Sequence, residues 1–214
     1  MYSPAHFQET RTPVLHDLIR AHPLAVLVTL DANGLVANHI PMELDATTGE
    51  LGTLRGHVAR SNPVWHAHRA EVEAMAVFQG PDGYITPSYY ATKATTGKVV
   101  PTWNYATVHA YGPLRAIEDP GWLRRFVEQL TDRHEAELAR AGEPAWKVGD
   151  APAAYIAKLL EAIVGLELPV TRLEGKWKVS QNRAADDRAG VAAGLERSDD
   201  PRRHAMAALV RERG

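Results

Sequence analysis

The chain has 214 residues, of which 45% are hydrophobic, and its formal net charge is -2 at pH 7. This length fits one domain, or one domain with a helical addition, and the apolar content is ample for a core. The near-balanced charge argues against a protein whose whole surface grips nucleic acid, although it leaves room for a local basic patch. The sequence contains no cysteine, which excludes disulfides, thiolate catalysis and cysteine-ligated metal clusters. Because it shows neither a charged leader with an apolar segment nor an apolar run of roughly 18 residues, we expect a soluble cytoplasmic protein.

The first half of the chain has the periodicity of a helix followed by an antiparallel meander. Apolar side chains recur at helical spacing over residues 10–21, which predicts a short helix. The β-type runs 24–30 and 35–44 flank the turn Asp31-Ala-Asn-Gly34, and this arrangement predicts a hairpin. Further strands are expected at residues 50–57 and 73–79.

The second half adds one long strand and then mainly helices. Residues 80–97 are rich in turn-forming and hydroxyl side chains, and a loop of that length is usually functional or disordered. The strand 99–112 follows this loop. Helices are expected at about 119–141 and 150–165, a last strand at 166–179, and tail helices at 183–195 and 200–213. Five or more antiparallel strands with helices after the sheet predict an α+β barrel.

The strand 99–112 has two chemically different faces, because successive side chains alternate across a strand. One face carries the small side chains Val100, Thr102, Asn104, Ala106, Val108 and Ala110. The other face carries Trp103, Tyr105, Thr107, His109 and Tyr111. Large rings that keep a polar edge need a flat, partly polar partner or a neighbouring subunit. A cofactor bound at a dimer interface would meet both requirements.

The predicted third strand and its exit concentrate groups that can bind an anion. Arg55, His57, Arg60 and Asn62 fall within eight positions, and small residues beside them let a ligand approach the backbone. Arginine forks and backbone N–H groups at a loop or helix start commonly hold a phosphate. The alternative interpretation is a solvated strand end whose arginines pair with nearby acids. The sequence has no glycine-rich phosphate-binding motif that would strengthen the first interpretation.

The string at residues 174–183 also alternates. One face carries Lys176, Lys178 and Ser180, and the other carries Trp177 and Val179. Basic groups gathered on one face suggest ligand contact, and the alternative is a solvated edge with Trp177 in the core.

The ten histidines of the sequence invite a metal hypothesis. The group His57, His66 and His68 lacks the helical spacing with an acid that a zinc hydrolase requires, because His66 and His68 are only two positions apart. We therefore expect no metal site.

Several strings taken together are more specific than any one of them. They are Met1-Tyr-Ser-Pro, His22-Pro-Leu-Ala25, Gly56-His-Val-Ala-Arg-Ser-Asn-Pro63, Phe78-Gln-Gly-Pro81, Val100-Pro-Thr-Trp-Asn-Tyr105 and Gly175-Lys-Trp-Lys-Val-Ser-Gln-Asn182. The set resembles the PaiB-type FMN-binding negative transcriptional regulators from Met1 to about residue 195. The sequence departs slightly at Ser61, where the family pattern has alanine.

The resemblance implies a fold, a cofactor and an assembly. The fold would be an antiparallel FMN-binding split β-barrel with flanking helices, of the pyridoxamine-phosphate-oxidase-like class. It implies a barrel domain over residues 1–182 with inserted helices, and a helical tail over residues 183–214 packed on the barrel. The protein would be a bacterial homodimer with FMN in the groove between the subunits, and it would repress sporulation and secreted-enzyme genes.

The resemblance also implies which residues hold the cofactor. Arg55, His57, Arg60 or Asn62 would meet the phosphate. The isoalloxazine ring would be lined by Gln79, Thr102, Trp103 and Asn104, and the second subunit would contribute Lys178 and Gln181.

Three functions stay open at the level of sequence. The first is an FMN-binding repressor, although we find no helix-turn-helix pattern and only a weakly basic tail for contact with DNA. The second is an FMN-dependent reductase or oxidase of a small molecule, with residues 80–97 as a lid and Tyr84, Tyr89, Lys93 and His109 as substrate contacts. The third is a binding module with an empty interface, against which the polar groups of the aromatic face argue.

Overall fold

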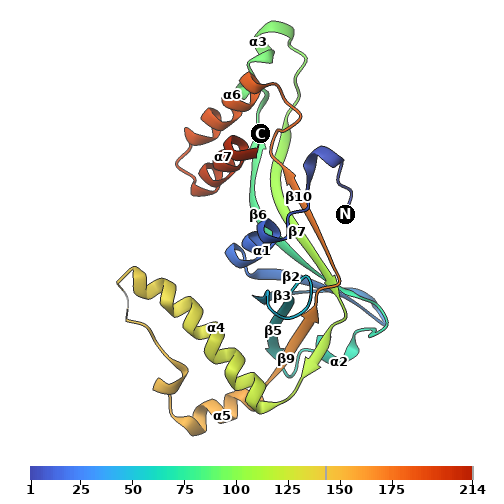
Figure 1. The fold of residues 1–214 in the computed structure, drawn as a ribbon, viewed down its shortest axis with the longest axis vertical. Coiled ribbons are helices and arrows are strands. Elements are labelled where there is room, and N and C mark those ends of the chain that lie inside the picture. The colour runs from blue at the N-terminus through green and yellow to red at the C-terminus, as the bar shows by residue number, and fades with distance from the viewer. Residues whose placement is uncertain (143, 214) are drawn as a thin grey trace. The chain divides into compact units, whose positions relative to one another are not determined.

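A computed structural model describes residues 1–142 and 144–213 of the chain. The chain divides into two compact units, each built from segments distant in sequence (Figure 1). Unit 1 comprises Met1–His22, Val77–His109 and Leu173–Gly214, and unit 2 comprises Pro23–Ala76 and Ala110–Arg172. Among the described residues, no helix is both long and apolar enough to cross a membrane.

Unit 1 is organised around strands that neighbour one another in the order β1, β10, β7, β6. Their bounds are Gln8–Glu9 for β1, Arg172–Lys178 for β10, Thr102–Gly112 for β7 and Ala74–Ile85 for β6. The helical elements of this unit are η1 (Ala5–Phe7), α1 (Thr12–Ala21), η2 (Pro87–Tyr89), α3 (Thr92–Thr96), α6 (Ala185–Glu196) and α7 (Pro201–Arg213). The predicted first helix and both tail helices are therefore confirmed.

Helix α1 packs closely on two strands of unit 1, and glycines allow this approach. A Cβ atom at Gly80 of β6 would lie 2.8 Å from the Leu18 side chain, and one at Gly175 of β10 would lie 2.3 Å from Leu15. Ile19 of the same helix is fully buried. The apolar face that the periodicity predicts is thus buried on the sheet.

Unit 2 contains the predicted hairpin and a four-stranded antiparallel sheet. The hairpin joins β2 (Leu24–Asp31) to β3 (Gly34–Pro41), and its turn is held by the Asn33 N–H donating to Asp31 Oδ1 at 2.6 Å. The sheet has the order β4, β5, β9, β8. These strands span Glu43–Asp45, Thr53–Ala59, Ile163–Pro169 and Arg115–Ile117, and the helical elements are α2 (Val64–Ala67), α4 (Pro120–Arg140), η3 (Val148–Asp150) and α5 (Ala153–Glu161).

Helix α4 begins at the predicted position, directly after its cap residue Asp119. Asp119 accepts a hydrogen bond from the Trp122 N–H at 2.6 Å, and Pro120 occupies the first helical position. The Trp122 ring stacks on Phe126 at 5.2 Å and lies over Gly165 of β9, where a Cβ atom would clash with the indole at 2.3 Å. The first half of α4 is therefore fixed on the sheet of unit 2.

Several predicted boundaries are wrong for identifiable reasons. Strand β6 continues to Ile85 instead of ending at residue 79, and its burial pattern changes phase between Gly80 and Gly83. The predicted strand 166–179 is two strands, since Thr171 lies between them and donates its N–H to the Tyr111 carbonyl. Helix α5 ends at Glu161, so the predicted helix end at 165 falls inside β9.

The apolar side chains of α5 differ in their burial. Only Ile156 is buried, whereas Tyr155 and Leu159 are exposed. A similar difference affects α4, where Leu123 and Phe126 are buried but Leu138 is half exposed.

The two faces predicted for the strand at 99–112 are confirmed along β7. Asn104, Ala106, Val108 and Ala110 are buried, while Trp103 is 55% exposed. Two residues differ from the expectation. Val100 precedes the strand and is exposed. Thr107 is buried, and its hydroxyl donates to the Phe78 carbonyl at 3.0 Å, which satisfies this polar group in the interior. The expected division at residue 182 stays a prediction, and both tail helices lie in unit 1.

Candidate functional site

The exposed face of β6 and β7 in unit 1 presents two aromatic rings to solvent. Trp103 of β7 and Tyr84 of β6 lie edge to face, with ring centroids 6.0 Å apart. Tyr84 is 42% exposed and reaches this face because the phase shift in β6 turns it outward. Gln79 is also exposed on β6. Exposed rings with open faces can pack against a flat ligand.

Lys178 at the end of β10 is fixed beside this aromatic face. Its ammonium group donates to the Thr102 hydroxyl and, at 2.8 Å, to the main-chain oxygen of Trp103. Burial lowers the pKa of Lys178, and the nearby Lys176 and Arg183 lower it further. The two hydrogen-bond acceptors are neutral, so they orient the ammonium group without neutralising it.

Lys176 is a second cation on β10, and its side chain is buried. Its ammonium group donates to the Tyr2 carbonyl at 2.9 Å and lies 5.6 Å and 5.3 Å from the ring centroids of Tyr2 and Tyr105. These contacts are cation–π interactions and one hydrogen bond. Tyr2 is a residue that sequence reasoning missed, because no periodicity connects the first residues of the chain to β10.

Two predicted cofactor residues in unit 1 support the backbone after β10. Asn104 is buried and its amide donates to the Ser180 hydroxyl at 2.9 Å, where Ser180 has a left-handed φ of 71°. The Gln181 side chain accepts from the Val179 N–H at 2.8 Å and donates to the Trp177 carbonyl. Asn104 and Trp103 therefore point to opposite faces of β7, as the alternation predicts.

The remaining predicted residues lie in unit 2, and the first of them is Arg55 on β5. Its guanidinium group pairs with Asp45 and with Glu167 of β9, both at 2.9 Å. Hydrogen bonds from Thr47 and Thr48 hold the pKa of Asp45 well below its ordinary value. Arg55 thus has two carboxylate partners, as the alternative interpretation of this strand expects.

His57, also on β5, is half-buried and has an unpaired nitrogen. Its Nδ1 atom is buried without a hydrogen-bond partner, and its ring lies edge-on to Phe126 with centroids 5.8 Å apart. Burial lowers the pKa of His57, which favours the neutral ring. An unpaired buried nitrogen of this kind is free to bond a ligand.

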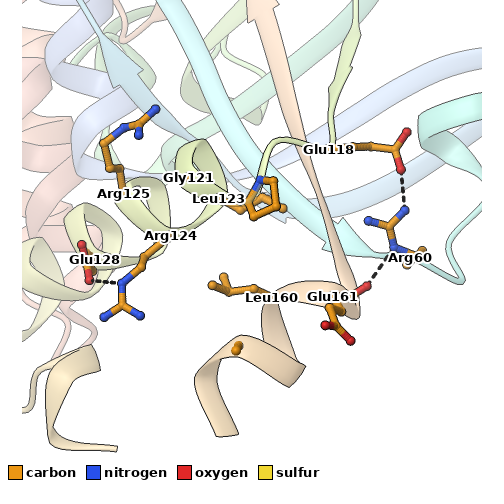
Figure 2. A pocket seen from close by; sticks show the side chains of 11 residues that line it. Arg60, Glu118, Gly121, Leu123, Arg124, Arg125, Glu128, Leu160 and Glu161 are labelled. Carbon is orange, nitrogen blue, oxygen red and sulfur yellow. Dashed lines mark hydrogen bonds and ion pairs between the residues drawn. The ribbon is translucent and has the colours of Figure 1, made fainter. Parts of the chain in front are cut away.

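Arg60 follows β5 and closes one end of a groove of about 790 Å³ between α4 and α5 (Figure 2). Its guanidinium group donates to Glu118 at 2.6 Å and to the main-chain oxygens of Glu161 and Ile163 at 2.8 Å and 3.2 Å. Figure 2 also shows Arg124 paired with Glu128 along the same groove, at 2.9 Å. Arg60 is therefore committed to protein partners, like Arg55.

The Asn62 side chain stabilises the start of α2, and both of its polar atoms bond protein groups. Its side-chain oxygen accepts from the Val64 N–H at 3.0 Å, and its amide donates to Asn38 of β3 at 2.8 Å. The ten predicted residues thus fall into two groups, four in unit 2 and six in unit 1. Among the six residues of unit 1, hydrogen bonds join Lys178 to Thr102 and Trp103. The roles of all ten residues in cofactor binding stay predictions.

The groups of the unit 1 face fit a flavin. A flavin offers a flat ring system for the exposed rings of Trp103 and Tyr84. FMN also carries a phosphate, and the ammonium groups of Lys176 and Lys178 have no carboxylate partner among the described residues. Flat apolar area beside unneutralised cations is the chemistry that such a cofactor requires.

Comparison with solved structures identifies the class of fold. The FAD and heme binding protein from Mycobacterium smegmatis aligns with a TM-score of 0.58 at 22% identity, covering 87% of this chain and 80% of that one. A conserved hypothetical protein from Mycobacterium tuberculosis aligns with a TM-score of 0.54 at 12% identity, covering 83% and 91%. The chain shares the fold of these two proteins, a mixed α+β fold with antiparallel sheets, as the sequence predicts.

Sequence comparison identifies the family. Residues 1–172 match the family described as "Putative FMN-binding domain". The protease synthase and sporulation protein PAI 2 from Bacillus subtilis is 28% identical over 213 residues, and an uncharacterised protein from Emericella nidulans is 37% identical over 246 residues. Both alignments cover 100% of this chain and 98% of the relative. The chain belongs to this PaiB-type FMN-binding family, and FMN is its cofactor.

Proposed function

We propose that the protein is a PaiB-type negative regulator of transcription that acts as a homodimer with FMN between its subunits. The observation that carries this proposal is the full-length match to the Bacillus subtilis sporulation protein. Relatives from a fungus and a bacterium both match over the whole chain, so the proposal concerns the molecular role and not the kind of organism.

The exposed face of unit 1 supports a cofactor between subunits. Trp103, the second residue of β7, is 55% exposed, whereas Asn104, Ala106, Val108 and Ala110 on the opposite face of the strand are buried. A flavin ring covered on its other side by a second subunit would remove this apolar area from water. Lys178 would then meet the polar edge of the ring, because its ammonium group is held beside Trp103.

The proposal is tested first on the purified protein. We expect a yellow protein whose visible spectrum shows bound flavin, and a dimer by light scattering on a sizing column. FMN added to stripped protein should raise the melting temperature. Stripped protein that neither binds FMN nor dimerises would contradict the proposal.

A second candidate, an FMN-dependent oxidoreductase of a small molecule, is favoured by the charges of the tail. The basic residues of α7 and its start are largely paired with acids, as in Arg202–Asp200, Arg211–Glu196 and Arg213–Glu9. Paired arginines offer little to a phosphate backbone. This observation weakens the case for direct contact between α7 and DNA. The bound flavin would then be the active group.

Two measurements separate the candidates. Labelled promoter DNA titrated at several salt concentrations should show binding that weakens with salt for a regulator that contacts DNA directly. Oxidation of NAD(P)H under oxygen should show turnover for an oxidoreductase. Turnover without salt-dependent DNA binding would overturn the regulator role.

A further inference from the structure

The hairpin of β2 and β3 in unit 2 is apolar on both of its faces. One face belongs to the core, where Ala25, Leu27 and Ile40 are buried. The opposite face, here called the hairpin face, consists of four cross-strand pairs, which are Leu24 with Pro41, Val26 with His39, Val28 with Ala37, and Leu30 with Leu35. On this face Leu35 is 79% exposed and Leu24 is 59% exposed. The hairpin therefore presents aliphatic side chains to solvent.

The sequence of β2 is not typical of a strand with one face in water. Such a strand alternates apolar with polar side chains, whereas a strand covered on both faces reads as a continuous apolar run. Residues 24–30 read Leu-Ala-Val-Leu-Val-Thr-Leu, so apolar side chains point to both sides. Burial alternates along the same residues, and the side of Val26 and Val28 stays partly exposed. The composition of β2 thus suits a second cover over the hairpin face.

Strand β3 adds an unprotected edge. It is the last strand in the order of its sheet, directly after β2. An edge strand presents main-chain groups that can pair with another chain, and proteins commonly protect it with charged side chains. Strand β3 spans Gly34–Pro41 and contains no Asp, Glu, Lys or Arg. An uncharged edge beside an exposed apolar face favours association.

The chemistry of the hairpin face selects the partner. Its eight side chains include no carboxylate, ammonium or guanidinium group. A nucleic acid or a charged peptide would find no opposite charge there. A second copy of the same face fits better, because two aliphatic sheet faces can pack across a two-fold axis without placing like charges opposite each other.

The size of the hairpin face limits its share of such a contact. Each strand has eight residues. At about 3.3 Å per residue and about 10 Å across two strands, the face covers about 260 Å². A stable interface takes about 800 Å² from each partner. The hairpin face is therefore large enough for the apolar centre of an interface, and the residues around it must supply the rim.

We propose that the hairpin face is the self-association surface of the protein, on which a second copy packs by the same face. The inference rests on the proposed function in one respect, since a homodimer is part of that function. It adds which side chains hold the two copies together. Because these side chains form the contact by themselves, the dimer should form with or without flavin.

The first test places a charge in the contact, in Leu24→Glu and Leu35→Glu. Both side chains are exposed, so the fold of one copy should tolerate the change. Across the contact each carboxylate would lose its water without gaining a partner. Leu159→Glu on α5 is the matched control, because Leu159 is an exposed leucine of unit 2 outside the hairpin.

Dimer dissociation is measured by sedimentation of flavin-bound and stripped protein over a range of concentrations. We expect the wild type and Leu159→Glu to form the same dimer. Each hairpin variant should dissociate at least about tenfold more readily. Circular dichroism and melting curves show whether the variants are folded.

The second test uses the absence of cysteine from the sequence. A single cysteine in Ala37→Cys lies in the middle of the hairpin face, and Ala157→Cys on α5 is its exposed control. A short bismaleimide should join two copies of the Ala37 variant and leave the Ala157 variant uncoupled. This test decides the question where a glutamate variant does not fold.

The outcomes separate this inference from the proposed function. Folded hairpin variants that dimerise like the wild type, or an Ala37→Cys protein that does not couple, would overturn the inference and leave the homodimer in place. A wild type that is monomeric at every concentration would overturn both. Monomeric hairpin variants with unchanged FMN affinity would support the inference and contradict a flavin held between subunits.

Discussion

The ammonium group of Lys178 lies 2.8 Å from the main-chain oxygen of Trp103, so a cation from β10 is fixed beside an exposed indole ring of β7. The two residues come from different strings of the sequence, 75 positions apart. Their proximity explains how one face can offer both stacking area and charge to a flavin.

Replacing the exposed ring should weaken the cofactor without harming the fold. We expect Trp103→Leu to lower FMN affinity about fivefold, because aromatic stacking contributes about 1 kcal/mol beyond the burial of area. The melting temperature without ligand should stay within about 2 °C, since Trp103 is mostly exposed and surface changes are small. Flavin fluorescence titration measures the affinity.

Trp146→Leu is the control for this change, because Trp146 is also exposed but has no predicted role in binding. It should leave FMN affinity unchanged. Equal affinities of the Trp103 variant and the wild type would remove this ring from the flavin site.

The ion pairs of Arg55 indicate a role in stabilising the fold. Its guanidinium group joins Asp45 of β4 and Glu167 of β9 across the sheet, and all three side chains are largely buried. We expect Arg55→Ala to cost about 1–3 kcal/mol of folding free energy, because two carboxylates lose their cation. Urea unfolding measures this loss.

The exposed pair Arg20–Asp17 supplies the comparison, since Arg20→Ala should cost less than about 0.5 kcal/mol. FMN titration of the Arg55 variant then tests the predicted phosphate role separately. A stable variant with weakened FMN binding would favour the cofactor role over the structural one.

The fold was largely predictable from the sequence where burial follows a regular period. The alternation along β7 and the hairpin at Asp31 to Gly34 depend on local chemistry, and both are confirmed. The end of β6 was not predictable, because Gly80-Pro81 is typical of a turn and here lies within the strand. Periodicity also could not show that Tyr155 of α5 is exposed, since an apolar stripe does not say what covers it.

The sequence allowed us to predict which residue types form the candidate site, but it did not show which contacts they make. Alternation correctly separated Trp103 from Asn104, but it could not show that Asn104 bonds Ser180 in the interior. Arg55 and Arg60 fitted two interpretations, a phosphate site and a strand end paired with acids. Only the structure shows that Arg55 pairs with Asp45 and Arg60 with Glu118. Tertiary neighbours decide such pairings, and a single strand does not contain them.

Glu9 should make stability depend on pH in the acid range. Hydrogen bonds from Arg11 lower the pKa of this carboxyl from 4.5 to about 2. Because the pKa in the folded state lies below that in the unfolded state, the ionised group stabilises the fold above pH 4.5. This contribution is lost as the pH falls through about 2.

Melting temperatures of the wild type and Glu9→Gln between pH 7 and pH 2 test this expectation. The variant should melt lower at pH 7, and its curve should approach that of the wild type as the pH falls. Parallel curves over the whole range would show that Glu9 is not the titrating group.

Gly175 should be intolerant of any side chain, because α1 lies directly on β10 at this position. A Cβ atom would lie 2.3 Å from the Leu15 side chain and 2.7 Å from the Glu9 carbonyl. Leu15 is buried and the carbonyl belongs to the backbone, so neither contact is relieved cheaply. We expect Gly175→Ala to cost about 3 kcal/mol in urea unfolding.

The matched control is Gly149→Ala, since a Cβ atom at Gly149 meets nothing within 4 Å. It should change stability by less than about 0.5 kcal/mol.

Because Gly175 directly precedes Lys176, any strand shift that accommodates the new methyl group in the Gly175 variant also displaces the Lys176 ammonium group. The protein that remains folded should therefore bind FMN more weakly if this lysine holds the cofactor's charge. Wild-type stability in the Gly175 variant would contradict the close packing of α1 on β10.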